Sequence, residues 1–379
     1  MSGLYSVEDL LDPQYLSPFY SEIASANMNN PFLQFYAGSG GIDNPGDIIE
    51  MTYFPANKTP VPLNKKGSPA KTQSLIGAQS YFHKPIHIFN ELTLPLHSVM
   101  NMRAPDSQAV DPKGRAEIDR QFKAFVYRQN LARSVAISKA FANGVIYVDP
   151  DGVILESSSG AELTIDLQVP AGHKSQLDYN GGGAIINTAG DNSAALILED
   201  LRQIRVAAEE QNAEYPNHVW MHSTGLGWLR ANTEIKAYIQ GGGSPERTEY
   251  LLNGYGASGT NGVNGVTFEL GGYTWHFYDG TYTASDGTVK PLIPTTKAII
   301  TPDPNPTWFR NYNGMEIVPT QVGVFGGFQE ALNSVGEIYG DFAYATIGHN
   351  PPKISIFAGT NFLYAFANPN AVWMPTVDF

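Results

Sequence analysis

Hydrophobic and polar positions change their spacing several times along the chain, and the clearest helical pattern lies in residues 112–143. Apolar side chains recur there every three or four residues, as they do on one face of an α-helix. Asp111 and Pro112 open the segment as an N-cap and a first helical residue, and Asn143-Gly144 closes it. The pattern therefore predicts a single helix about 46 Å long. Its seven basic and two acidic residues form either a solvated face or a basic ridge that pairs with acidic neighbours.

Residues 48–100 have the alternation and β-branched content of strands. Two such segments, DIIEMTYFP and SYFHKPIHIFNELTLPL, flank a polar stretch broken by prolines. We expect one long hairpin with arms of about 10–15 residues, which would reach roughly 35–50 Å. Because an isolated two-stranded ribbon is marginal in water, the hairpin needs another surface, and a neighbouring subunit would supply it.

Residues 1–47 are rich in Ser, Asn, Gly and Pro, with aromatic residues between these helix breakers. A short helix is expected at residues 6–11, with Ser6 as its N-cap. The remainder is predicted to be an arm whose aromatic side chains dock on another surface.

The rest of the chain mixes helices and strands. We expect a turn at residues 149–152 (DPDG), an amphipathic helix at 193–212, a strand at NHVWMHS and a short helix after it. Asp286-Gly287 predicts a tight hairpin within residues 279–300, where Pro291 and Pro294 then interrupt pairing. From residue 340 onward nearly every segment has a strand pattern. This order indicates an α+β protein.

The amino-acid composition narrows the classes of protein to which the chain could belong. Only 16% of residues are charged, which favours a surface largely covered by partners, and the net charge is −13. Such acidity argues against a protein that reads nucleic acid, but not against one that encloses it without adhering to it. Cysteine is absent, so disulfides and cysteine ligands are excluded. No signal peptide and no apolar run near the roughly 20 residues of a membrane span are recognised.

The sequence contains motifs that partly match cofactor and metal sites, but none matches fully. Residues 254–259 match a dinucleotide-binding pattern, but the glycine-rich stretch that follows cannot form the required helix. His83, His87, Glu91 and His97 share a strand parity, and His218 and His222 flank Trp220; polar contacts explain both groups better than a metal does. The DPDG segment lacks the further acidic ligands of a calcium loop. We therefore predict no catalytic residue, no cofactor and no metal.

The order of elements resembles that of tailed-bacteriophage major capsid proteins with the Hong Kong 97 fold, most of all the lambda-type major capsid protein E family. Four segments carry the resemblance: ISKAFANGVIYVDPDGVIL, TGLGWLRANTEIKAYI, TYTASDGTVKPLIPTTKAIITP and NFLYAFANPNAVWMPTV. It covers roughly residues 48–379. It implies an N-terminal arm in 1–47, an extended loop in 48–100, a peripheral domain in 101–190 built on helix 112–143, an axial domain in 191–339 and return strands of the peripheral domain in 340–379.

The resemblance also implies a function. The chain would self-assemble into hexamers and pentamers of an icosahedral head around double-stranded DNA, with no reaction to catalyse. Scaffolding, portal and decoration proteins are implied as partners, with assembly in the host bacterial cytoplasm and final location in the virion. The residues expected at contacts between subunits are Phe32, Phe35, Tyr53, Phe54, Lys65, Lys66, Tyr81 and Phe82. Two alternatives stay open: an encapsulin-like bacterial compartment, and a β-rich carbohydrate-binding or enzymatic protein.

Overall fold

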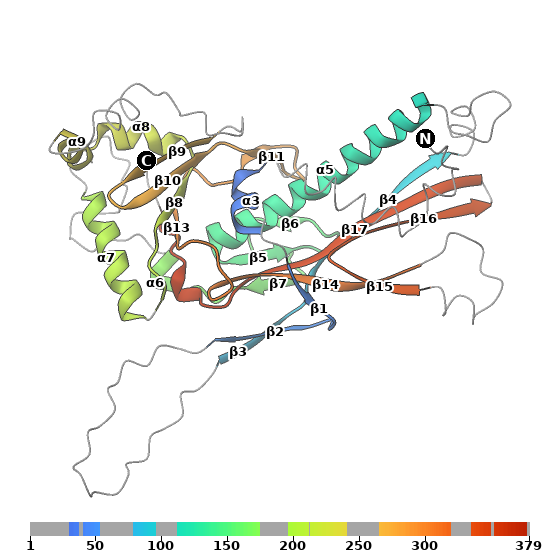
Figure 1. The fold of residues 1–379 in the computed structure, drawn as a ribbon, viewed down its shortest axis with the longest axis horizontal. Helices are drawn as coiled ribbons and strands as arrows, with labels where there is room; N and C mark the ends of the chain where they lie inside the picture. Colours follow the sequence, from blue (N-terminus) through green and yellow to red (C-terminus); the bar gives the residue numbers. More distant parts are fainter. Residues whose placement is uncertain are drawn as a thin grey trace, which may run out of the picture.

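The computed structural model describes residues 30–37, 41–53, 79–95, 112–174, 196–211, 213–240, 265–319, 335–349 and 352–376. Two groups of elements divide it (Figure 1). One is a four-stranded sheet with short helices beside it, and the other is a six-stranded sheet that lies near one long helix. The α+β fold class predicted from the sequence is confirmed.

The long helix α5 (Pro112–Asn143) has the predicted bounds. Its C-terminal half is buried, with Ala136, Ile137, Ala140 and Phe141 fully enclosed by the protein. The helix ends where Gly144 adopts a left-handed φ of 68°, and the Gly144 N–H still donates to the Ala140 carbonyl at 2.9 Å. The helix thus ends in the core, whereas its N-terminal end projects away from the four-stranded sheet in Figure 1.

The six-stranded sheet is organised around β17 (Pro352–Phe366). β17 pairs antiparallel with three strands: β16 (Asp341–His349), β4 (Ile86–Pro95) and part of β14 (Phe309–Pro319). β14 in turn pairs with β15 (Val335–Tyr339) and, in parallel, with β1 (Ile42–Asn44). β14 and β15 were expected in the axial domain, before the boundary at residue 340, but they lie in the same sheet as the return strands.

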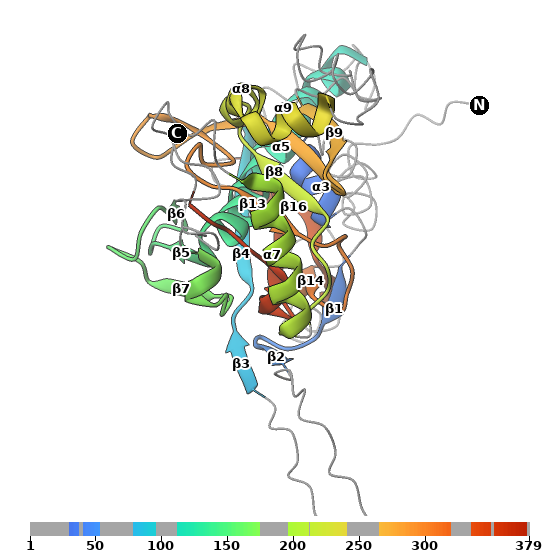
Figure 2. The same cartoon turned by 90° about the vertical axis from the view of Figure 1, so that its left-hand side faces the viewer.

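The base of the predicted long hairpin lies within the described residues. β2 (Ile49–Tyr53) pairs antiparallel with β3 (Gln79–His83), so each described arm has five residues. β3 ends before Lys84-Pro85, because proline has no N–H for the ladder. The following strand β4 was expected in the hairpin and instead joins β17. The β2–β3 pair extends away from both main sheets in two perpendicular views (Figures 1 and 2).

Behind α5 lies a three-stranded sheet of β5 (Val145–Val148), β6 (Ile154–Leu155) and β7 (Leu163–Asp166), followed by α6 (Ala171–Lys174). The predicted DPDG turn joins β5 to β6. Asp149 closes it by accepting a hydrogen bond from the Val153 N–H at 2.7 Å, and Gly152 supplies a left-handed φ of 78°.

The four-stranded sheet has the order β13-β8-β10-β9. Its strands are β8 (His218–Met221), β9 (Gly265–Leu270), β10 (Tyr273–Tyr278) and β13 (Ile299–Thr301). Around it lie α7 (Ile197–Glu210), α8 (Thr224–Ala231) and α9 (Thr233–Gln240), as Figure 1 shows. One helix was expected after β8. Two form because Asn232 caps a new start, its side-chain oxygen accepting from the Ile235 N–H at 3.0 Å.

The hairpin predicted about Asp286-Gly287 is also present, as β11 (Thr281–Thr283) and β12 (Val289–Pro291). It packs on α5 rather than standing free. Tyr282 is buried, and its hydroxyl donates to Glu156 at 2.7 Å, while Lys139 of α5 pairs with the same carboxylate at 2.5 Å. The hairpin and the long helix therefore share one carboxylate as an anchor.

Substitution of Gly144 by alanine is expected to lower the free energy of unfolding by about 1–2 kcal/mol, because a Cβ disfavours left-handed φ. The added methyl would also approach Val169 Cβ at 3.2 Å. Gly227→Ala in α8 is the matched control, since its Cβ would meet nothing within 4 Å. Urea denaturation of both variants checks the prediction, and equal effects would contradict it.

Candidate assembly surface and polar junction

The β2–β3 hairpin has one buried and one exposed face. Ile49 and Met51 point into the core, whereas Glu50, Thr52 and Phe82 are exposed. Glu50 lies opposite Phe82 in the register, and 61% of the Phe82 surface is accessible to solvent. An aromatic side chain so exposed on an otherwise anchored hairpin is a candidate contact for another molecule.

His83 fixes the base of this hairpin. Its Nε2 lies 2.9 Å from the Asp166 carbonyl oxygen at the end of β7, so the imidazole N–H donates across to the three-stranded sheet. Burial lowers the pKa of His83, which keeps the ring neutral. The described hairpin therefore leaves the body of the subunit from a fixed point.

Two of the other five residues that we predicted at loop contacts, Tyr53 and Tyr81, lie within the described hairpin. Tyr81 lies on β3 and is half-buried against the core, and Tyr53 ends β2. Phe54, Lys65 and Lys66 lie outside the described residues, as do the expected helix at residues 6–11, His97 and the glycine motif at 254–259.

The aromatic residues in the described part of the arm dock within their own chain. Phe32 and Phe35 belong to α3 (Pro31–Ala37), whose first turn is capped by Asn30 accepting from the Phe32 N–H at 2.9 Å. Phe32 is buried, with ring centroids 5.5 Å from Phe141 and 5.1 Å from Trp220. We expected these two residues at a contact with a neighbour. Phe32 is instead enclosed within the chain, and Phe35 is half-buried against His218 and Trp220, so its contact with a neighbour stays a prediction.

The histidine patterns do not assemble a metal site within the described ranges. His87 pairs with Glu316 at 3.1 Å, and Glu91 accepts hydrogen bonds from Thr93 and Ser355. These are the polar contacts that were expected of the strand.

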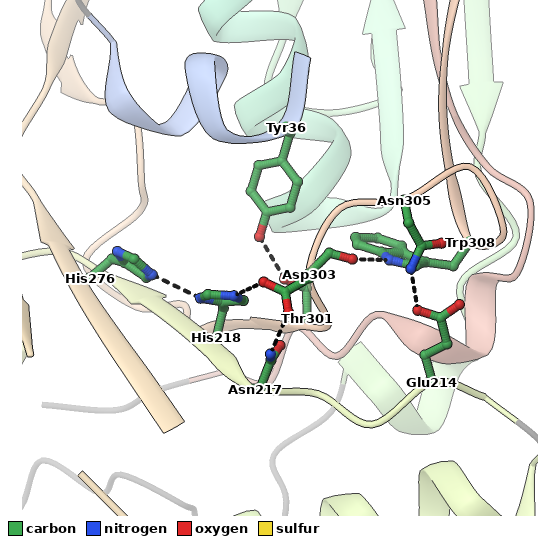
Figure 3. Close-up of polar contacts among 9 residues, drawn as sticks. All are labelled: Tyr36, Glu214, Asn217, His218, His276, Thr301, Asp303, Asn305 and Trp308. Atoms are coloured by element: carbon green, nitrogen blue, oxygen red, sulfur yellow. Dashed lines mark hydrogen bonds and ion pairs between the residues drawn. The ribbon is translucent and has the colours of Figure 1, made fainter. Parts of the chain in front are cut away.

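A polar junction lies where α3, the four-stranded sheet and the segment between β13 and β14 meet (Figure 3). His218 is buried at the start of β8, and its two ring nitrogens have different partners. Nδ1 lies 3.0 Å from Nε2 of His276 on β10, and Nε2 lies 2.6 Å from Oδ1 of Asp303. Asn217 donates to the other oxygen of Asp303 at 2.8 Å. Sequence reasoning noted His218 but missed His276 and Asp303, because strand pairing and a distant loop bring them together.

Further contacts tie the same segment down. The indole N–H of the buried Trp308 donates to the Asp303 carbonyl at 2.8 Å, and the Asn305 amide donates to Glu214 at 2.5 Å. The Tyr36 hydroxyl of α3 lies 2.6 Å from Oγ1 of Thr301. Burial raises the pKa of Tyr36, so its hydroxyl is neutral. The arm helix and the segment that leaves β13 are thus fastened at one place.

Electrostatics at the junction favour a neutral His276 and an ionised Asp303. Burial, and then the neighbouring His218, lower the pKa of His276 to about 3. The hydrogen bond from His218 lowers the pKa of Asp303, and Asn217 adds to the shift. The His276 ring also stacks on Trp220, with a centroid distance of 4.1 Å and an interplanar angle of 12°. None of the described helices is long and apolar enough to cross a membrane.

Comparison with solved structures finds the same fold in a prophage protein and more distant similarity in others. A protein assigned as the capsid protein of a prophage in Escherichia coli CFT073 aligns over 97% of this chain and 99% of its own, with 14% identity and a TM-score of 0.52. A phage-related protein from Bordetella bronchiseptica RB50 is 10% identical over 93% of this chain and 96% of its own, with a TM-score of 0.47. The SrpI encapsulin of Synechococcus elongatus PCC 7942 is 11% identical, over 92% and 88% of the two chains, with a TM-score of 0.40.

Sequence comparison gives the family. No curated protein sequence matches the chain. A family model described as "Phage major capsid protein E" matches residues 23–375, which includes both sheets, α5 and the hairpin. The chain therefore belongs to the phage major capsid protein E family.

Proposed function

We propose that this subunit self-assembles into hexamers and pentamers that close into the icosahedral head of a tailed phage, around double-stranded DNA. The match to the capsid family over residues 23–375 carries this proposal. The role is structural, with no reaction catalysed. Copies of the chain are then one another's main partners, and the finished protein is located in the virion after assembly in the host bacterial cytoplasm.

The β2–β3 hairpin and the residues between its strands are proposed to lie on a neighbouring subunit. Phe82 supports this, because it is the most exposed large apolar side chain of the described hairpin and lies on the face opposite to the buried Ile49 and Met51. Burial of a phenylalanine contributes about 1.5–3 kcal/mol. Tyr53, Phe54, Lys65 and Lys66 are proposed to add to the same contact. Tyr81, which was also expected there, pairs with Met51 on the opposite face and is half-buried against the core.

The charge of the subunit fits the enclosure of DNA without sequence-specific binding. A net charge of −13 repels phosphates, so an acidic shell would not hold packaged DNA by electrostatic attraction when the DNA is released. Scaffolding, portal and decoration proteins are proposed as further partners.

Electron microscopy of the protein expressed alone tests the proposal. Closed particles, capsomers or tubes are expected, and a monodisperse monomer under assembly-promoting conditions would contradict it. Particles isolated from infected or induced cells should contain nuclease-protected DNA. An enclosed enzyme in place of DNA would instead support the encapsulin-like alternative.

A further inference from the structure

The hydrogen-bonding capacity of the polar junction determines how many protons it holds. An ionised carboxylate can only accept, so the proton between His218 and Asp303 sits on Nε2 of His218, 2.6 Å from the carboxylate oxygen. The contact between the two histidines needs one donor and one acceptor. Nδ1 of His276 lies 3.3 Å from Oγ1 of Thr267, a hydroxyl that can donate or accept.

Two protonation states satisfy this geometry without moving a heavy atom. In the neutral state, His276 donates from Nε2 to Nδ1 of His218, and the Thr267 hydroxyl donates to Nδ1 of His276. With one added proton, His218 donates from both ring nitrogens, and His276 accepts at Nε2 and donates from Nδ1 to Thr267. The added charge then lies beside the Asp303 carboxylate, the favourable place for it.

A second added proton has no place in this arrangement. It would set two N–H groups of two imidazolium rings against each other across a 3.0 Å contact. Of the groups in electrostatic contact with His276 or Asp303, His218 on β8 would itself be charged and Tyr36 on α3 is neutral, so neither supplies an anion for a second proton. The carboxylate of β9 on the same face, Glu269, lies opposite Thr274, one pair further along that face. Protonation of Asp303 would likewise remove the anion that holds His218.

The junction also occupies a mechanical position. The segment of residues 302–308 links β13 of the four-stranded sheet to β14 of the six-stranded sheet, and Asp303 lies within it. On the other side, Phe35 of α3 packs against both imidazoles, with ring centroids 4.7 Å from His218 and 5.7 Å from His276. Loss of the junction would therefore loosen the arm helix and the link between the sheets together.

We propose that His218, His276 and Asp303 form a one-proton latch that holds α3 and residues 302–308 on the four-stranded sheet and that opens when acid supplies a second proton. The direction follows from linkage. The unfolded chain takes up a proton on His276 near its ordinary pKa of about 6.5, whereas the folded chain does so only near pH 3. The contribution of His276 to stability is thus complete above about pH 6.5 and declines as pH falls toward 3. The lowered pKa of Asp303 acts in the same direction, at lower pH.

Hydrogen exchange of the unassembled subunit, labelled at pH 7.5, 6.0, 5.0 and 4.5 with times scaled to the intrinsic exchange rate at each pH, tests the latch. Deuterium uptake in residues 30–37 and 302–308 is expected to rise at least threefold between pH 7.5 and pH 4.5, with little change in the buried half of α5. In His276→Gln, which cannot become charged, uptake in both segments should no longer depend on pH. An unchanged parent, or the same rise in His276→Gln, would overturn the proposal.

Two further variants keep the test decisive. His173→Gln removes another buried histidine, whose ring stacks on Trp373 and contacts the Val372 carbonyl and not His218, His276 or Asp303, and should behave as the parent does in both segments. If His276→Gln fails to fold, Asp303→Asn replaces it: loss of the anion should raise uptake in both segments at pH 7.5 and leave little further response to acid. Protection equal to that of the parent in Asp303→Asn would refute the latch. These outcomes do not depend on shell formation, so they are separate from the test of the proposed function.

Discussion

Phe141→Ala is expected to lower the free energy of unfolding of the subunit by about 3–5 kcal/mol. The Phe141 ring is fully buried and lies 4.2 Å from Tyr36, 5.5 Å from Phe309 and 5.0 Å from Phe366, measured between centroids. These partners come from the arm helix, from β14 and from β17, so no single element can move to fill the cavity. A loss of this size is a large part of the roughly 5–15 kcal/mol that stabilises a folded domain.

Guanidinium denaturation of the unassembled subunit measures this effect. Tyr127→Ala is the matched control, because it removes an aromatic side chain from the same helix at a position that is 52% exposed. The control should change the free energy of unfolding by no more than about 0.5 kcal/mol. If Phe141→Ala destabilised the subunit no more than Tyr127→Ala does, the central place of Phe141 in the core would be refuted.

Phe82→Glu is expected to abolish shell formation while leaving the subunit folded. Phe82 is exposed in the isolated subunit, so the change removes little internal packing. At a contact with a neighbour it would replace about 1.5–3 kcal/mol of apolar burial by an unpaired charge, next to Glu50 across the hairpin. Every 1.4 kcal/mol lost changes the equilibrium constant of the contact by a factor of ten, and a closed shell repeats the contact many times.

Light scattering and electron microscopy at the concentration at which the parent assembles measure the result. Val206→Glu on α7 is the control, since it also introduces a carboxylate at an exposed apolar position, but far from the hairpin in the chain. The control should assemble. Normal shells from Phe82→Glu would show that the described hairpin face is not a contact, whereas unfolding of the variant would show that Phe82 packs internally. The first result would leave the family membership intact.

Local patterns in the sequence predicted local structure well. The bounds of α5 follow from helical spacing between an Asp-Pro start and an Asn-Gly end, and the turns at residues 149–152 and at Asp286-Gly287 follow from backbone preferences of a few residues. Each of these signals lies within one element. The family resemblance, which rested on the order of such elements, was sound for the same reason.

Non-local pairing was not predictable from these signals. β4 reads as a hairpin arm, and only the sheet reveals that its partner is β17. The aromatic residues of α3 likewise have the pattern of an external contact, whereas the partners that bury Phe32 lie on α5 and β8. The polar junction combines three elements, and the carboxylate of Asp303 sits in a segment that resembles an ordinary turn. Partners so far apart in the sequence leave no signal in a local pattern of residues.

The pairing of β4 with β17 has a consequence for synthesis. Pro95 pairs with Lys353 and Ile86 with Phe362, so the two strands are made at very different times on the ribosome. Because β17 spans residues 352–366 of 379, the six-stranded sheet can form only after most of the chain has emerged, and closing so long a loop slows the step further. A truncated product that lacks β17 would leave β4 and β14 without their shared partner. Completion of the sheet thus acts as a length check on the chain, and only subunits that pass it can present a folded hairpin base to another copy.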